Sequence, residues 1–121
     1  MKKSLSDSEM MEILGESYAV LEEKKALETV VMDLSRVNSY FEYFIIATGS
    51  SMVHCKSLAR DLRKYFTAKG LKEGMKPDMN SGWIILDYNG IIVHVFTEEL
   101  REYYQLEKLW ADAERIEFEE V

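Results

Sequence analysis

The 121-residue sequence has little of what holds small proteins together other than a hydrophobic core. Its one cysteine, Cys55, cannot form a disulfide within the chain, which favours a reducing compartment. One proline and six glycines leave no sign of a linker or low-complexity tract. With 47% hydrophobic residues, a chain of this length should bury roughly two-thirds of its unfolded surface. We therefore expect residues 1–121 to form one domain around an apolar core.

Long apolar runs are also missing. No segment approaches the ~20 apolar residues of a membrane-spanning helix. Residues 1–9 are too polar for the hydrophobic part of a signal peptide. The sequence therefore predicts a cytoplasmic protein that makes no membrane contact.

Basic residues are scarce relative to acidic ones: 15 Lys and Arg stand against 22 Asp and Glu, a formal charge of −7. Because Lys and Arg neutralise phosphates, this balance argues against a free-standing nucleic-acid binder and favours a basic protein partner. Residues 98–121 hold nine acidic and three basic residues, so they account for −6 of the −7. We expect the acidic tail, residues 112–121, to fray.

Hydrophobic periodicity predicts three helices. The first follows a capping-box pattern, Ser6 with Glu9, and covers about residues 8–25. The clearest helix follows Gly49-Ser50-Ser51 and stops at Gly70. A third begins at Glu98. The expected core-facing positions are Met11, Leu14, Tyr18 and Leu21; Cys55, Leu58, Ala59, Leu62 and Phe66; and Leu100, Tyr103 or Tyr104, Leu106 or Glu107, and Trp110.

The second helix carries basic residues on its other side: Lys56, Arg60, Arg63 and Lys64. Surface helices commonly carry such charges. We therefore interpret these residues as a solvated face, and a minor RNA contact is the alternative.

Two short runs, residues 29–34 and 43–48, have the composition of strands, and the second is apolar on both faces and should be central. After a polar loop, residues 71–81, Asn89-Gly90 joins two further strands, because a type I′ turn needs positive φ at both central residues. This turn pairs Tyr88 with Ile91 and, at the far end, Trp83 with Phe96. The predicted order is α-β-β-α-β-β-α, an α/β domain around a mixed four-stranded sheet.

Alternation sorts the hairpin into two faces. The first is plain core, and the second mixes aromatic and ionisable groups, as a partly exposed recognition face or a face covered by a helix would. The first face holds Ile84, Leu86, Tyr88, Ile91, Val93 and Val95, and the second holds Trp83, Ile85, Asp87, Ile92, His94 and Phe96.

Residues that could carry chemistry are few. A Gly49-Ser50 turn between strand and helix is also found in nucleotidyltransferases, but metal-dependent phosphoryl transfer needs convergent carboxylates, and no Asp-x-Asp follows. Ser51 is better explained as a helix cap, Cys55 as a small hydrophobe, and His54 as a surface residue. His94 fits a hydrogen-bonded sheet residue, and two His with one Cys supply no zinc site. We expect no catalytic residue, metal or cofactor.

Several separate motifs, in order, resemble the Iojap family of ribosomal silencing factors over about residues 8–113. They are Asp33-Leu34-Ser35, Tyr43-Phe44-Ile45-Ile46-Ala47-Thr48-Gly49, Ser51-x-x-His54, Ser81-Gly82-Trp83-Ile84-Ile85-Leu86-Asp87-Tyr88, Val93-His94-Val95-Phe96 and Arg101-x-Tyr103-Tyr104-x-Leu106-Glu107-x-Leu109-Trp110-x-Asp112-Ala113.

The resemblance implies a nucleotidyltransferase-like fold without its catalytic carboxylates. It also implies a partner, the large ribosomal subunit, contacted at ribosomal protein L-fourteen so that the small subunit cannot join and translation is repressed. Large-subunit assembly is the alternative role, and a nucleotide-binding protein is a more distant one. The expected protein is thus not an enzyme.

Carried onto this chain, the family's binding strip falls on the hairpin: Trp83, Asp87 and Tyr88, with Leu86, Asn89 and Gly90 nearby. Large aromatic rings suit such a strip, because they bury much area at low entropic cost. Family members often have Gly-Asp where this chain has Asn89-Gly90. The acidic tail could add attraction to a basic ribosomal surface, although a solvating tail is favoured. A minor ribosomal RNA contact and a homodimer of the free protein are further expectations.

Overall fold

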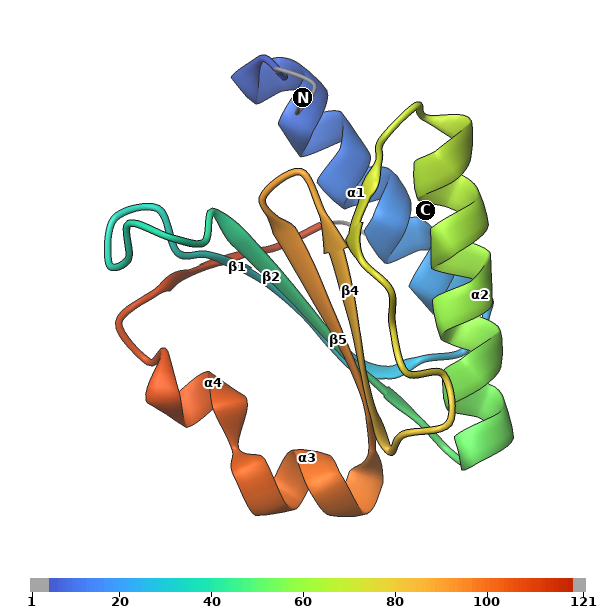
Figure 1. Cartoon of the computed structure of the whole chain (residues 1–121). Helices are drawn as coiled ribbons and strands as arrows, with labels where there is room; N and C mark the ends of the chain where they lie inside the picture. Colours follow the sequence, from blue (N-terminus) through green and yellow to red (C-terminus); the bar gives the residue numbers. More distant parts are fainter. Residues whose placement is uncertain (1–4, 119–121) are drawn as a thin grey trace.

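The computed structural model, which describes residues 5–118, is a mixed β-sheet with helices on both faces (Figure 1). The six strands lie in the order β3-β4-β5-β2-β1-β6. Helices α1 and α2 pack on one face, and the short helices α3 and α4 lie on the other. The elements are α1 (Asp7–Glu23), β1 (Leu27–Asp33), β2 (Tyr43–Gly49), α2 (Met52–Ala68), β3 (Glu73–Met75), β4 (Trp83–Tyr88), β5 (Ile91–Thr97), α3 (Glu98–Tyr104), α4 (Leu106–Leu109) and β6 (Glu114–Ile116).

Helix α1 begins at the predicted capping box. The Ser6 side chain accepts from the Glu9 amide at 3.1 Å, and the Glu9 carboxylate accepts from the Ser6 amide at 3.1 Å. At the other end Lys25 takes a left-handed φ of 64°, which lets the Ala26 amide donate to Leu21 O. The expectation for Met11 was wrong: it is 40% exposed, because the buried stripe is rotated onto Met10, Ile13, Leu14, Ser17 and Leu21.

The centre of the sheet follows the sequence pattern closely. Six of the seven residues of β2 are buried, as its two-sided apolar run predicts. Strand β2 lies parallel to β5 and antiparallel to β1, so the sheet is mixed as expected. The core side of α2 is also as predicted, with Cys55, Leu58, Ala59, Leu62 and Phe66 all 0% exposed.

The β4–β5 hairpin has the predicted register over all six residue pairs, from Tyr88 with Ile91 to Trp83 with Phe96. Asn89 and Gly90 have φ of 52° and 91°, the positive values that a type I′ turn requires. The amides of Glu42 and Tyr43 both donate to Gly90 O, at 3.3 and 3.1 Å. The turn is therefore fixed to the start of β2.

Two strands were not predicted from the sequence pattern, which indicated four. Strand β3 lies in the predicted loop 71–81 and pairs with β4. Strand β6 lies in the tail expected to fray and pairs with β1, after which Phe118 packs its ring 5.5 Å from that of Tyr18. The described fold therefore extends to residue 118 rather than 113, and residues 119–121 of the predicted tail lie outside the described residues. Runs of three residues are too short to show a period, so only pairing with a neighbour reveals them.

The predicted third helix is two helices. Gln105 has φ 46°, a left-handed conformation that ends α3 and starts α4. This break buries Leu106 and leaves Tyr103 77% exposed. Within the described part of the chain, none of the helices combines the length and apolar character needed to cross a bilayer.

Candidate recognition surface

The second face of the hairpin is covered at one end and open at the other. His94 and Phe96 on β5 are buried, and they lie against a second apolar cluster that includes Phe44 and Leu106. Trp83, Ile85 and Asp87 on β4 remain partly exposed. Both interpretations of this face therefore hold for part of it: short helices cover the β5 side, and the β4 side stays open to solvent.

Trp83 is the most firmly positioned of the predicted binding residues. Its indole Nε1 donates to His94 Nδ1 at 2.9 Å. Its ring lies 4.9 Å from the ring of Phe96 and 4.8 Å from that of Tyr104. Because the indole is held on two sides and by a hydrogen bond, little rotamer freedom remains to be lost when a partner binds.

The partner of the indole, His94, is held neutral by its surroundings. The side chain is almost fully buried, and this desolvation lowers the pKa of His94 to about 4. Since Nδ1 accepts from Trp83, the proton belongs on Nε2, which has no hydrogen-bond partner among the described residues. The expectation of a hydrogen-bonded sheet histidine is confirmed, with the orphaned Nε2 as a cost to stability.

Leu86 and Tyr88, two of the predicted binding residues, lie on the opposite face from Trp83 and are 0% and 1% exposed. The Tyr88 ring stacks on Phe66 at 4.6 Å, and its hydroxyl donates to Glu73 Oε1 at 3.0 Å. Burial, with Glu73 adding to it, raises the pKa of Tyr88. Neither side chain can touch a partner in this structure, because strand alternation turns residues 86 and 88 into the core.

The open part of the predicted set is therefore Trp83, Asp87, Asn89 and Gly90, all partly exposed. Trp83 and Asp87 share one face of β4, at its two ends, and the turn continues the strand beyond Asp87. The structure thus brings four of the six predicted residues onto one accessible strip.

Tyr103 and Tyr104 extend this strip, although the sequence pattern placed one of them in the core. Tyr103 is 77% and Tyr104 49% exposed, and their rings lie 5.0 Å apart. With Tyr104 packed on Trp83, these three rings form what we call the aromatic surface (Trp83, Tyr103, Tyr104). Two adjacent aromatic residues on one helix cannot both face a core, which is the signal that could have identified it.

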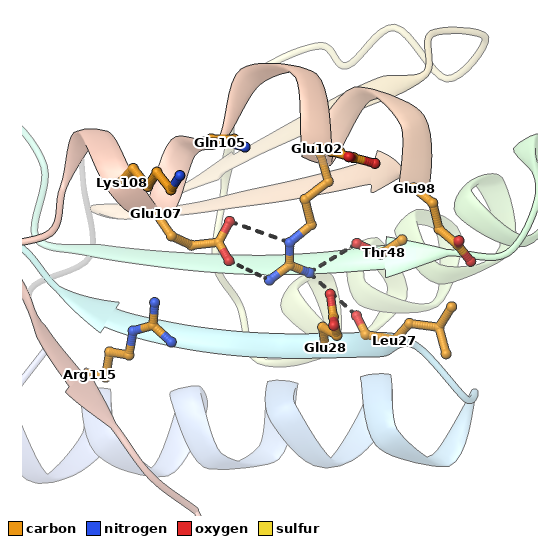
Figure 2. A pocket seen from close by; sticks show the side chains of 10 residues that line it. Leu27, Glu28, Thr48, Glu98, Glu102, Gln105, Glu107, Lys108 and Arg115 are labelled. Carbon is orange, nitrogen blue, oxygen red and sulfur yellow. Dashed lines mark hydrogen bonds and ion pairs between the residues drawn. The ribbon is translucent and has the colours of Figure 1, made fainter.

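A polar pocket of about 640 Å³ lies between the short helices α3 and α4 and the strands β1 and β2 (Figure 2). At its base Arg101, only 8% exposed, donates to Glu107 at 2.9 Å, to Thr48 Oγ1 at 2.9 Å and to Leu27 O at 3.4 Å. Burial is the largest single influence on Glu107 and opposes its ionisation, but the hydrogen bonds and positive charge of Arg101, with smaller contributions from the Glu107 backbone and Arg115, together lower the pKa of that carboxyl. The lining residues are Leu27, Glu28, Thr48, Glu98, Arg101, Glu102, Gln105, Glu107, Lys108 and Arg115.

Arg101 therefore acts as a structural link. It joins the two short helices across the Gln105 break and ties both to β1 and β2. Buried guanidinium groups persist only when their donors are paired in this way. The pocket's deepest cation is already neutralised by Glu107, so we assign it to holding α3 and α4 in place.

The Gly49-Ser50 turn is also occupied by structural contacts. A Cβ at Gly49 would lie 2.6 Å from Cys55 Sγ, so this glycine allows close packing against α2. Ser51 caps α2 by accepting from the His54 amide at 3.0 Å, as predicted. His54 is less of a surface residue than expected: Nδ1 accepts from the Ser50 amide at 2.9 Å, and Nε2 contacts Lys24 O at 2.8 Å. It joins the turn to the end of α1.

The acidic side chains do not converge. Asp33 accepts from Ser35, and Asp61 pairs with Lys24 at 3.7 Å. Among residues 5–118 no group of three His, Cys, Asp or Glu side chains could hold a metal ion. Cys55 is buried, and desolvation raises the pKa of its thiol, which disfavours the reactive thiolate.

Comparison with known proteins gives a consistent picture. Residues 7–121 match the family model described as "Ribosomal silencing factor during starvation". The chain is 30% identical over 111 residues to the ribosomal silencing factor RsfS of Halalkalibacterium halodurans, covering 91% of this chain and 95% of that protein. It is also 30% identical over 102 residues to the RsfS of Bacillus subtilis, covering 84% and 86%.

A mouse protein named "Mitochondrial assembly of ribosomal large subunit protein 1" is 30% identical over 101 residues, which is 76% of this chain and 42% of that protein. A crystal structure of a Chromobacterium violaceum protein superposes with a TM-score of 0.79 at 27% identity, covering 93% and 94% of the two chains. The family is known for ribosomal silencing and assembly rather than for an enzymatic activity. With a match over nearly its whole length, this chain belongs to the RsfS, or Iojap, family of ribosomal silencing factors.

Proposed function

We propose that this protein binds the large ribosomal subunit at ribosomal protein L-fourteen and thereby prevents the small subunit from joining. The action is steric exclusion, which needs an interface and no turnover. Family membership supports the ribosomal partner. The observation that carries the interface is the aromatic surface, in which Trp83 is held in position by a hydrogen bond to His94 and by the ring of Tyr104.

The proposed interface combines that surface with Asp87 and the Asn89-Gly90 turn. Pre-positioned aromatic rings are effective anchors, because they exclude water over a large area without much loss of side-chain entropy. The surrounding acidic residues of α3, Glu98, Glu99 and Glu102, are all exposed and suit a basic ribosomal protein. Leu86 and Tyr88 contribute from below, by holding β4 in place.

Sedimentation of separated ribosomal subunits with purified protein tests this proposal, at a magnesium concentration that permits joining. We expect the wild type to travel with the large subunit and to reduce the joined peak. Trp83→Ala should lose most of both effects while staying folded. Met11→Ala, which removes an apolar side chain exposed on the opposite face of the sheet, is the matched control and should behave as wild type.

If the wild type neither binds the large subunit nor changes joining, silencing is wrong for this chain. Equal behaviour of Trp83→Ala and wild type would instead remove the aromatic surface from the interface. Sedimentation of the free protein in the same buffers tests whether this surface pairs two copies of the chain when no ribosome is present.

A role in large-subunit assembly is the second candidate, favoured by the name of the mouse relative. Both roles use the same contact, so the timing of binding separates them. Association with precursor particles before mature subunits appear would support assembly. Nucleotide binding is the third candidate, and magnesium-dependent binding of a nucleoside triphosphate to the purified protein would support it against the scattered carboxylates described above.

A further inference from the structure

One side of α2 carries a line of three cations. Lys56, Arg60 and Lys64 recur every four residues, which places them one above another along the helix. Arg60 and Lys64 are exposed and Lys56 is partly so. In the part of the chain that the structure describes, none of the three forms an ion pair. We call these three residues the α2 basic line.

Two other cations in or next to α2 do have anionic partners. Arg63, on the same helix, pairs with Glu73 at 2.8 Å, and Lys69 pairs with Glu16 at 2.8 Å. The chain has 22 carboxylates for 15 Lys and Arg, so acidic partners are plentiful. Lys56, Arg60 and Lys64 have no ion-pair partner among the described residues because of where the carboxylates lie, not because carboxylates are few.

Basic residues are concentrated in α2 and in the loop that follows it. Residues 52–76 contain seven Lys and Arg and two Asp and Glu, a formal charge of +5 in a chain of −7. Residues 98–121, at −6, include α3 and α4, which lie on the opposite face of the sheet from α2 (Figure 1). Helix α1, which lies on the same face as α2, carries six acidic residues and no basic one, so the positive charge on that face is confined to α2 and the loop that follows it.

We infer that the α2 basic line binds the phosphate backbone of ribosomal RNA, while the aromatic surface on the other face of the sheet meets protein. This inference rests on the proposed ribosomal function and adds a second contact to it. Side chains four residues apart on a helix are about 6 Å apart, so the line can follow one phosphate strand. Backbone recognition requires cations and little else.

A protein partner fits this side of α2 less well. Protein interfaces centre on buried apolar and aromatic anchors and are depleted in lysine. Beyond Met52 and Val53 in its first turn, the described α2 exposes no large hydrophobic side chain. The composition of this face therefore matches RNA better than protein.

The test measures binding of the full chain to purified large subunits over a series of salt concentrations. The triple variant Lys56→Gln, Arg60→Gln, Lys64→Gln should bind at least about tenfold more weakly at low salt. The slope of log K against log salt is negative, and it should become shallower by about 2 in the variant. Each phosphate that a cation neutralises contributes about 0.7 to 0.9 to the steepness of that slope. Glutamine is a good helix former, so α2 should persist.

The matched control removes three positive charges elsewhere: Lys25→Gln, Arg36→Gln, Lys108→Gln, all exposed and outside any ion pair of the described residues. It should keep the wild-type slope. The exchange Lys56→Arg, Arg60→Lys, Lys64→Arg should also behave as wild type, because it keeps the charge. Equal slopes for wild type and the first triple variant, or equal losses of affinity in the first variant and the control, would overturn the inference while leaving silencing intact.

A photoreactive side chain in place of Arg60 identifies what lies against the helix. Crosslinks to ribosomal RNA support the inference, and crosslinks confined to a ribosomal protein overturn it. Absence of any binding by the wild type overturns both this inference and the proposed function. A wild type that binds but whose salt dependence equals that of the triple variant overturns this inference alone, so the two failures are distinguishable.

Discussion

The two faces of the β4–β5 hairpin share one backbone and differ in almost everything else. On the first face every side chain is apolar or aromatic and buried beneath α1 and α2. The second face carries Trp83, Asp87 and His94, and it is covered only in part by two helices of seven and four residues. The incomplete cover is what defines the recognition surface, since a long amphipathic helix on this side would have buried Trp83 and Tyr104.

The largest expected effect is a difference in the free energy of unfolding between substitutions on the two faces of the hairpin. Leu86→Ala empties a fully buried position and should lower the free energy of unfolding by about 4 kcal/mol. Ile85→Ala, one residue earlier on the partly exposed face, should cost about 1 kcal/mol. Urea unfolding of both variants measures the difference. Similar losses in the two variants would mean that the second face is as closed as the first.

The second largest effect is expected at Arg101, which holds the short helices α3 and α4 against the sheet. Arg101→Ala leaves Glu107 without its buried partner and should destabilise the fold by about 3 kcal/mol. It should also release Tyr104 from Trp83, because α3 loses its tie to β1 and β2. Tryptophan fluorescence together with urea unfolding tests this. Lys108→Ala, an exposed cation at the pocket rim, is the control and should leave both readouts unchanged.

The weakest of the three effects is a pH dependence carried by His94. Its pKa is about 4 in the folded protein and near 6.5 when exposed in the unfolded chain. Between these values the unfolded state binds the extra proton, so stability is full above pH 6.5 and is lost as the pH falls toward 4. At pH 5 the loss should be roughly 2 kcal/mol.

The His94→Phe variant isolates that contribution, because other groups titrate equally in both proteins. The wild type should lose more stability than the variant between pH 7 and pH 5 in urea unfolding. The variant should also bind the large subunit more weakly, since the Trp83 indole loses its acceptor. Parallel pH profiles would show that His94 does not stay neutral in the fold.

Much of this architecture could be predicted from local pattern. Period-two alternation and the Asn89-Gly90 turn were sufficient for the hairpin register, because a single turn type fixes every pair beyond it. The capping box and the apolar spacing of α2 were equally direct. Strands β3 and β6 were not predictable, since three residues carry no period, and β6 also pairs with a strand distant in the sequence, β1.

The binding residues divide along the same line. The family resemblance gave Trp83, Asp87 and Tyr88 as binding residues, with Leu86, Asn89 and Gly90 as neighbours. Leu86 and Tyr88 are buried because strand alternation turns them into the core, and the other four are partly exposed. The sequence pattern placed one of Tyr103 and Tyr104 in the core, whereas both are exposed, because the left-handed Gln105 ends the helix directly after them.

Residue type and spacing along the chain were enough for the class of fold, the hairpin register and the family, because each of these depends on local pattern. Three-dimensional packing was needed to establish which side chains are accessible, that Trp83 is held by His94, and that α2 lies on the opposite face of the sheet from α3 and α4. These features depend on the cover that distant segments provide, and cover is a property of packing rather than of local sequence.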